Sequence, residues 1–189
     1  MIAVYSARGM SVFNGAEAFW QDFNAPEEPY DLLRFSMLMG ILPFSGYLLL
    51  YTITGKIWNM WPFIQSTLSV TRGLMCAGLQ WIFFATFPIL SALLLETILG
   101  RHRSFPESSS STVVTTYSMT PLFMAALFVG VPFFGRIIAV LAIATFLYLL
   151  YFGYRIYLKQ RAPRSGAMAL AVATLFALIR QMFVFVIGF

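Results

Sequence analysis

The chain has 189 residues, of which 60% are hydrophobic and only 10% are charged. A soluble domain carries about 25% charged residues, so this composition excludes a water-soluble globular protein and indicates that lipid is the solvent. The net charge of +5 comes from basic residues scattered at the ends of apolar runs, unlike the clustered basic face of a nucleic-acid-binding protein. One cysteine and one histidine form neither an intrachain disulfide nor a metal cluster. We therefore expect no nucleic acid, metal or cofactor.

Residues 1–30 are a short N-terminal segment that we expect to be cytoplasmic or interfacial. Asn14 and Glu17 have the spacing of a capping box at the start of a short amphipathic helix, which continues with Phe19, Trp20 and Phe23. Such a helix is either an anchor lying on the membrane surface or an element tucked against the bundle. We favour the second interpretation.

Five apolar stretches are each long enough to cross a hydrocarbon core, which takes about 20 residues. Because backbone polar groups in lipid must be satisfied within their own segment, these stretches are expected to be helices. The predicted fold class is therefore an all-α integral membrane protein, with a five-helix membrane domain over residues 31–189. The spans are expected at about 33–55, 73–100, 112–131, 136–157 and 165–188.

The segment 56–72 differs from the spans because polar residues interrupt it. Ile57, Met60, Trp61, Ile64 and Leu68 recur at helical spacing on one face, with asparagine, glutamine, serine and threonine on the rest. This amphipathic pattern, with two tryptophans near one end, predicts an interfacial helix between spans one and two.

The distribution of basic residues predicts the orientation. With five spans, one side of the membrane receives eight arginines and lysines and the other receives three: Lys56, Arg72 and Arg136. The positive-inside rule then places the N-terminus in the cytoplasm and the C-terminus outside. The very short break around Pro132 predicts that spans three and four form an antiparallel hairpin.

Glu96 and Arg180 are the two ionisable residues that lie clearly inside predicted spans, where such residues are costly and usually functional. Counting residues at about 1.5 Å each leaves them roughly 10 Å apart in depth, which argues against a direct pair. We expect Glu96 to meet Arg101, Arg103 or Arg155 near the cytoplasmic headgroups. Arg180 is expected to face the bundle, where helix carbonyls or a partner protein satisfy it.

Two further patterns have a packing explanation. Alanines repeat at four-residue spacing along span five (Ala167 and Ala171; Ala169, Ala173 and Ala177), which predicts a face packed closely against another helix, of this chain or of a partner. Tyrosines recur every three residues at 148, 151, 154 and 157. An aromatic belt at the membrane interface explains this stripe more simply than a ligand site does.

Three groups of residues carry a resemblance to a known family. The first group, Tyr117 and Pro121, opens span three within Tyr-Ser-Met-Thr-Pro-Leu. The second, Tyr148, Tyr151 and Gly153, closes span four within Tyr-Leu-Leu-Tyr-Phe-Gly. The third is in span one, which has a Leu-Pro followed by a glycine. In these features the chain resembles the Yip (Ypt-interacting protein) domain family, of the bacterial inner-membrane type. The spacing matches over about 40 residues, and the general plan covers residues 20–189. The resemblance implies a five-helix membrane domain, and it marks Tyr117, Pro121, Tyr148, Tyr151 and Gly153 as candidate functional positions.

No nucleophile–base set, phosphate-binding glycine loop or metal-ligand spacing is present in the sequence, so we expect no enzyme and no catalytic residues. The first hypothesis is a non-enzymatic protein of the cell inner membrane that binds or organises other membrane proteins, as an accessory subunit of a larger complex. Its expected partners are membrane lipids and other membrane proteins or copies of itself. The alternative is a small transporter or lipid-handling channel that uses Glu96 and Arg180.

Overall fold

The structure, a computed structural model, describes residues 15–23, 29–54, 70–98, 110–129, 131 and 133–187. Every regular element among these residues is a helix, which confirms the predicted all-α fold class. In chain order the elements are α2 (Ala16–Gln21), α3 (Pro29–Met39), α4 (Ile41–Thr54), α5 (Val70–Ile98), α6 (Ser110–Ser118), α7 (Thr120–Ala126), α8 (Phe134–Phe152), the π-helix η2 (Gly153–Tyr157) and α9 (Ala162–Ile187).

Four segments of the described chain are long and apolar enough to cross a membrane. They are Tyr30–Leu50, Gly73–Thr97, Phe134–Tyr157 and Ala162–Met182, and they correspond to predicted spans one, two, four and five. The first comprises α3 and most of α4, which are separated only at Gly40. The predicted interfacial helix falls almost entirely on residues 55–69, outside the described residues, and only its last three residues appear, as the start of α5.

The structure differs from the prediction in the third span. Over 112–131 the sequence predicts one helix, whereas the structure has two short ones, α6 and α7, with Met119 between them. The cause is Pro121, because proline has no N–H to donate and its ring collides with the carbonyl four residues earlier. Neither α6 nor α7 is long enough to cross a bilayer by itself.

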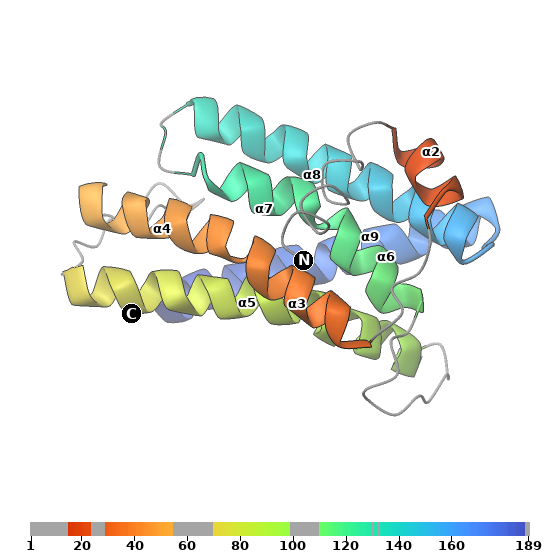
Figure 1. The fold of residues 1–189 in the computed structure, drawn as a ribbon, viewed down its shortest axis with the longest axis horizontal. Helices are drawn as coiled ribbons and strands as arrows, with labels where there is room; N and C mark the ends of the chain where they lie inside the picture. Colours follow the sequence, from red (N-terminus) through yellow and green to blue (C-terminus); the bar gives the residue numbers. More distant parts are fainter. Residues whose placement is uncertain are drawn as a thin grey trace.

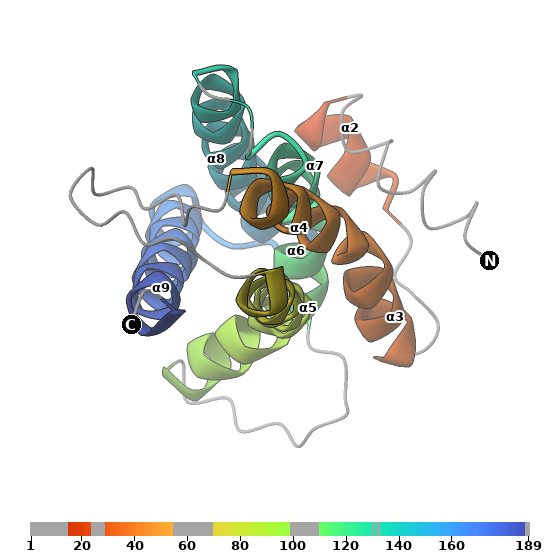
Figure 2. The ribbon, with the colours of Figure 1, turned by 90° about the vertical axis from the view of Figure 1, so that its left-hand side faces the viewer.

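The helices run roughly along one long axis, with α4 beside α5 and α7 beside α8 (Figure 1). At one end of the bundle, here named the α2 end, α3 begins, α5 ends and η2 lies next to α2. At the opposite end α4 finishes, α5 and α8 begin and α9 finishes. Viewed from that opposite end, α6 lies in the middle of the bundle (Figure 2), and its residues 111–118 are all buried.

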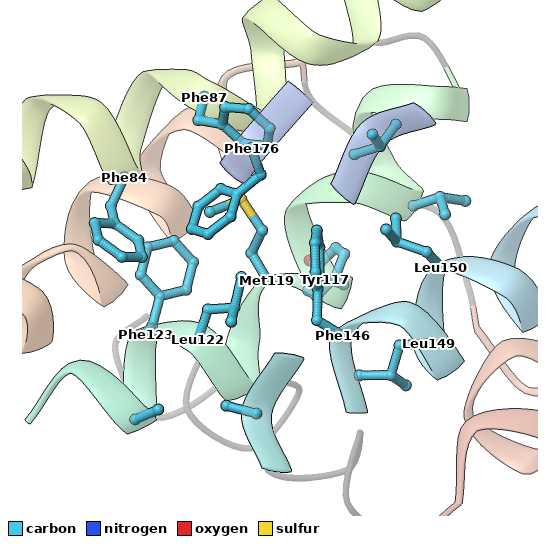
Figure 3. Packing of buried hydrophobic residues seen from close by; sticks show 14 of the residues in the cluster. Phe84, Phe87, Tyr117, Met119, Leu122, Phe123, Phe146, Leu149, Leu150 and Phe176 are labelled. Carbon is cyan, nitrogen blue, oxygen red and sulfur yellow. The ribbon is translucent and has the colours of Figure 1, made fainter. Parts of the chain in front are cut away.

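The core is built from aromatic rings contributed by helices that are distant in the sequence. Phe176 of α9 contacts Phe84 and Phe87 of α5, at ring-centroid distances of 6.0 and 5.1 Å (Figure 3). Its ring centroid also lies 5.5 Å from that of Phe83 on the same helix. Phe146 of α8 lies 5.9 Å from the Phe176 ring. These contacts fix the register of three membrane helices around Phe176.

The turn between α7 and α8 is tight, as the predicted hairpin requires. Phe133 has a φ of 61°, a backbone conformation that non-glycine residues rarely adopt. A Cβ on Gly135 would meet the carbonyl oxygen of Phe128, so only glycine allows the two helix ends to approach this closely. The helices leave the turn antiparallel and side by side (Figure 1).

Candidate functional site

The break between α6 and α7 is set by a tyrosine and a proline four residues apart. In a continuous helix the carbonyl of Tyr117 would accept the N–H of residue 121, and Pro121 has none. The hydroxyl of Thr120 takes its place and donates to the Tyr117 carbonyl over 2.8 Å. The Tyr-x-x-x-Pro motif therefore marks the carbonyl that loses its helical donor and the proline that removes it.

Polar side chains are buried around this break in a part of the molecule surrounded by apolar helices. Thr116 and Ser118 are fully buried, and neither hydroxyl oxygen has a hydrogen-bond partner within the described chain. Thr115 differs, because its hydroxyl donates to the Ser111 carbonyl over 2.9 Å. Hydroxyls without a partner are uncommon in protein interiors, so the break is a polar region inside an apolar bundle.

The Tyr117 ring joins α6 to the N-terminal part of the chain. Its ring centroid lies 4.7 Å from that of Phe35, 4.9 Å from Phe23 and 6.2 Å from Phe19. Tyr117 is fully buried. One of the predicted site residues thus forms the centre of an aromatic cluster between α2, α3 and α6.

Gly153 is the position at which α2 reaches the bundle. A Cβ there would lie 2.6 Å from a methyl carbon of Val114 and 3.0 Å from the Trp20 ring, so a larger residue would force α6 and α2 away. Trp20 is buried, and its indole N–H donates to the Leu149 carbonyl over 3.0 Å. The short N-terminal helix is therefore tucked against the bundle, which is the interpretation that the sequence favoured.

Glu96 lies at the α2 end, on the last turn of α5. It is 8% exposed. At the same end of the bundle, the hydroxyl of Tyr154 on η2 lies 3.4 Å from the hydroxyl of Thr115 on α6. Of the three basic partners predicted for Glu96, Arg101 and Arg103 fall outside the described residues. Arg155 is exposed and instead donates to the Tyr151 hydroxyl over 3.4 Å.

Arg180 lies towards the opposite end of the bundle and reaches across to another helix. Its guanidinium donates to the hydroxyl of Tyr47 on α4, a residue 133 positions away in the sequence. Tyr47 is 4% exposed, whereas the arginine is half-buried. Arg180 thus faces the bundle, and a tyrosine hydroxyl on another helix supplies an acceptor.

The structure keeps Glu96 and Arg180 apart. Phe176, one turn before Arg180, packs against Phe83, Phe84 and Phe87, which places Arg180 near the level of Gln80 on the antiparallel α5 (Figure 1). From residue 80 to residue 96 the helix rises about 24 Å. This exceeds the depth difference of about 10 Å expected from residue counting, and it agrees that the two charges do not form a pair.

The remaining predicted site residues lie in two different environments. Pro121 is buried at the start of α7. Tyr148 is 52% exposed on the outside of α8. Tyr151 is half-buried, with the Arg155 guanidinium 6.0 Å from its ring centroid. Tyr117, Pro121 and Gly153 therefore surround the helix break and the α2 contact, whereas Tyr148 lies on the outer surface.

Tyr47, Gln80 and Thr115 are buried polar residues that the sequence patterns did not indicate. Gln80 is the only amide within the uncharged stretch of α5, and this was the available signal. Tyr47 and Thr115 carried none, because tyrosine and threonine are common in membrane helices and their partners are far away in the sequence.

The fold and its polar groups define an all-helical integral membrane protein with no metal-ligand group among the described residues. The family model of the Yip1 domain matches residues 11–186. The chain therefore belongs to the Yip1 domain family, and the resemblance seen in the sequence is confirmed. No curated protein and no solved structure matches it.

Proposed function

We propose that this Yip1 domain protein is a non-enzymatic membrane protein that binds and organises other membrane proteins, as an accessory subunit of a larger membrane complex. The observation that supports this role is the outward face of α9. Ala167, Ala171 and Ala177 are exposed there, whereas Ala169 is buried against the rest of the chain. Small residues allow close approach of helix backbones, and no helix among the described residues covers these three alanines.

The two alanine series of α9 differ in their exposure, which the sequence pattern did not distinguish. The alanine series starting at 169 passes from buried to half-buried at 173 and to exposed at 177. Its first part packs within the chain. The series 167 and 171 faces outwards, where a helix of another protein or of a second copy can approach.

The test is co-purification in a mild detergent, with substitutions that fill the outward face. Ala171→Leu should lower the recovery of a co-purifying membrane protein several-fold, because the added side chain holds a partner helix away. Ala139→Leu is the matched control, since this alanine is exposed on α8. Recovery of this chain alone from the wild type, or equal loss with both substitutions, would count against the proposal.

A second candidate is a small transporter or lipid-handling channel. The observation that favours it is the broken helix α6–α7, with the buried hydroxyls of Thr116 and Ser118 beside the break. Transporters commonly place substrate sites at discontinuous helices near the bilayer midplane. In proteoliposomes, Arg180→Ala and Glu96→Gln should abolish the flux of the transported species. A wild type without flux, or variants with unchanged flux, would remove this candidate.

We further propose that the protein resides in the bacterial inner membrane with its N-terminus in the cytoplasm and its C-terminus outside. The excess of basic residues on one side supports this orientation. Reporter fusions at the two termini test it, because a C-terminal phosphatase fusion should be active and an N-terminal one inactive. The reverse pattern would contradict the orientation.

A further inference from the structure

The turn between η2 and α9 concentrates positive charge at the α2 end of the bundle (Figure 1). Four basic residues, all exposed, define what is here named the basic turn: Arg155, Lys159, Arg161 and Arg164. The turn joins the membrane-spanning segments Phe134–Tyr157 and Ala162–Met182. It therefore lies where the hydrocarbon core meets the headgroups. Its charge is a different property of the molecule from the outward alanines of α9, which support the proposed partner role.

The described part of the chain does not neutralise these charges. No carboxylate among the described residues forms an ion pair with any of the four basic side chains. Arg155 donates to the Tyr151 hydroxyl over 3.4 Å, a contact that leaves its charge in place. Glu17 of α2, at the same end of the bundle, accepts a hydrogen bond from Gln21 over 3.3 Å. Residues 108–189 contain no aspartate or glutamate, so the second half of the chain supplies no counter-charge from its side chains.

The local backbone indicates that the charges of the basic turn are kept at a cost. Lys159 has a φ of 51°, which lies in the left-handed region, where glycine is favoured and other residues are strained. Helix α9 begins at Ala162 and has no acidic residue in its first turn. Because the N-terminal end of a helix dipole is positive, it adds to the charge of Arg161 and Arg164 instead of offsetting it. Folding alone would favour a glycine at 159 and acidic residues at the start of α9.

We propose that the basic turn binds the headgroups of anionic lipids in the leaflet at the α2 end of the bundle. Its position specifies the partner, because the membrane-spanning segments on both sides of the turn place its side chains at headgroup depth. A basic segment next to a membrane helix gains about fivefold in affinity for an anionic surface with each lysine or arginine. The arginines also bind phosphate oxygens through paired N–H donors. Since the attraction is to net negative charge, a zwitterionic phospholipid binds this surface more weakly.

The test is a binding titration of the full chain in neutral detergent, followed by native mass spectrometry. The probes are phosphatidylglycerol and phosphatidylcholine, which both contain a phosphate, although only phosphatidylglycerol has a net negative charge. The wild type should bind phosphatidylglycerol several-fold more tightly than phosphatidylcholine. The double variant Arg161→Gln, Arg164→Gln should weaken phosphatidylglycerol binding about fivefold for each charge removed and leave phosphatidylcholine binding unchanged. Equal affinity of the wild type for the two lipids would overturn the proposal.

A second variant, Lys159→Gly, separates the charge from the fold. Because glycine suits the left-handed backbone at this position, the variant should be at least as stable as the wild type in an SDS titration. It should nevertheless bind phosphatidylglycerol about fivefold more weakly, since one charge of the turn is gone. This result tests the proposal even if the double variant fails to fold. Wild-type affinity in Lys159→Gly would contradict it.

Arg136→Gln is the matched control, because this arginine is exposed in the first turn of α8, at the opposite end of the bundle. The substitution removes the same charge from the chain outside the basic turn, so phosphatidylglycerol binding should stay unchanged. Equal weakening by Arg136→Gln and Lys159→Gly would show that only the net charge of the chain matters, and it would overturn the assignment to the basic turn.

Discussion

Replacement of glycine by alanine should change stability with opposite sign at two positions of the bundle. A Cβ on Gly46 would overlap the carbonyl oxygen of Ala126 and lie 2.7 Å from its carbonyl carbon. Relief of the overlap with the carbonyl oxygen to ordinary contact, about 3.5–4.0 Å, requires α4 and α7 to separate by about 1.5–2 Å. Overpacking of this kind costs about 3 kcal/mol when backbone must move. The helix propensity of alanine returns about 1 kcal/mol, so Gly46→Ala should lose about 2 kcal/mol.

At Gly78 the same substitution should be stabilising. Beyond the helix's own backbone, no atom of the described residues lies within 4 Å of a Cβ built there, so the propensity gain of up to about 1 kcal/mol remains. The free energies of unfolding of both variants are measured by SDS titration in mixed micelles, followed by circular dichroism. Equal stabilities for Gly46→Ala and Gly78→Ala would refute the close approach of α4 to α7.

Three other substitutions test the aromatic contacts at the α2 end. Gly153→Leu should lower the free energy of unfolding by about 3 kcal/mol through overpacking against Trp20, and hydrogen exchange should show loss of protection over residues 16–21. Trp20→Phe should cost about 1 kcal/mol in the SDS titration, because the bond to the Leu149 carbonyl is lost. Tyr117→Ala, at the centre of the aromatic cluster, should lower the free energy of unfolding by about 3–5 kcal/mol. Tyr148 is exposed, so Tyr148→Ala should change it by no more than about 0.5 kcal/mol. Equal losses in the two variants would contradict the difference in burial.

The sequence predicted the helical fold class because membrane helices leave a strong and local pattern. An apolar run of about 20 residues between charges has few alternatives in lipid. The family resemblance could be recognised for the same local reason, because Tyr117 and Pro121 are only four residues apart.

The helix break at Met119 was missed because proline is tolerated inside membrane helices when other groups satisfy the freed carbonyl. Pro88 is an example, since it lies within the continuous helix α5. Pro121 ends a helix instead, and Thr120 satisfies the Tyr117 carbonyl. Both prolines free a carbonyl four residues earlier, so the presence of a proline alone does not predict whether the helix continues or breaks.

The polar contacts were missed for a different reason. In lipid, residues that face the bundle and residues that face the membrane are equally apolar, so the pattern does not separate them. Tyr117 and Tyr148 belong to the same set of family positions, yet one is fully buried and the other is 52% exposed. The partner of Arg180 is a tyrosine 133 residues away, and no local rule indicates it.

Four of the positions that carry the family resemblance, Gly46, Tyr117, Pro121 and Gly153, have a structural explanation that does not depend on any ligand. Gly46 and Gly153 allow two pairs of helices to approach closely, and Tyr117 with Pro121 sets the break between α6 and α7. Arg180 belongs to none of these contacts. Tyr148 lies on the outer surface, so burial does not explain this family position. Arg180 is a charge inside a membrane-spanning segment, and its guanidinium joins α9 to Tyr47 on α4.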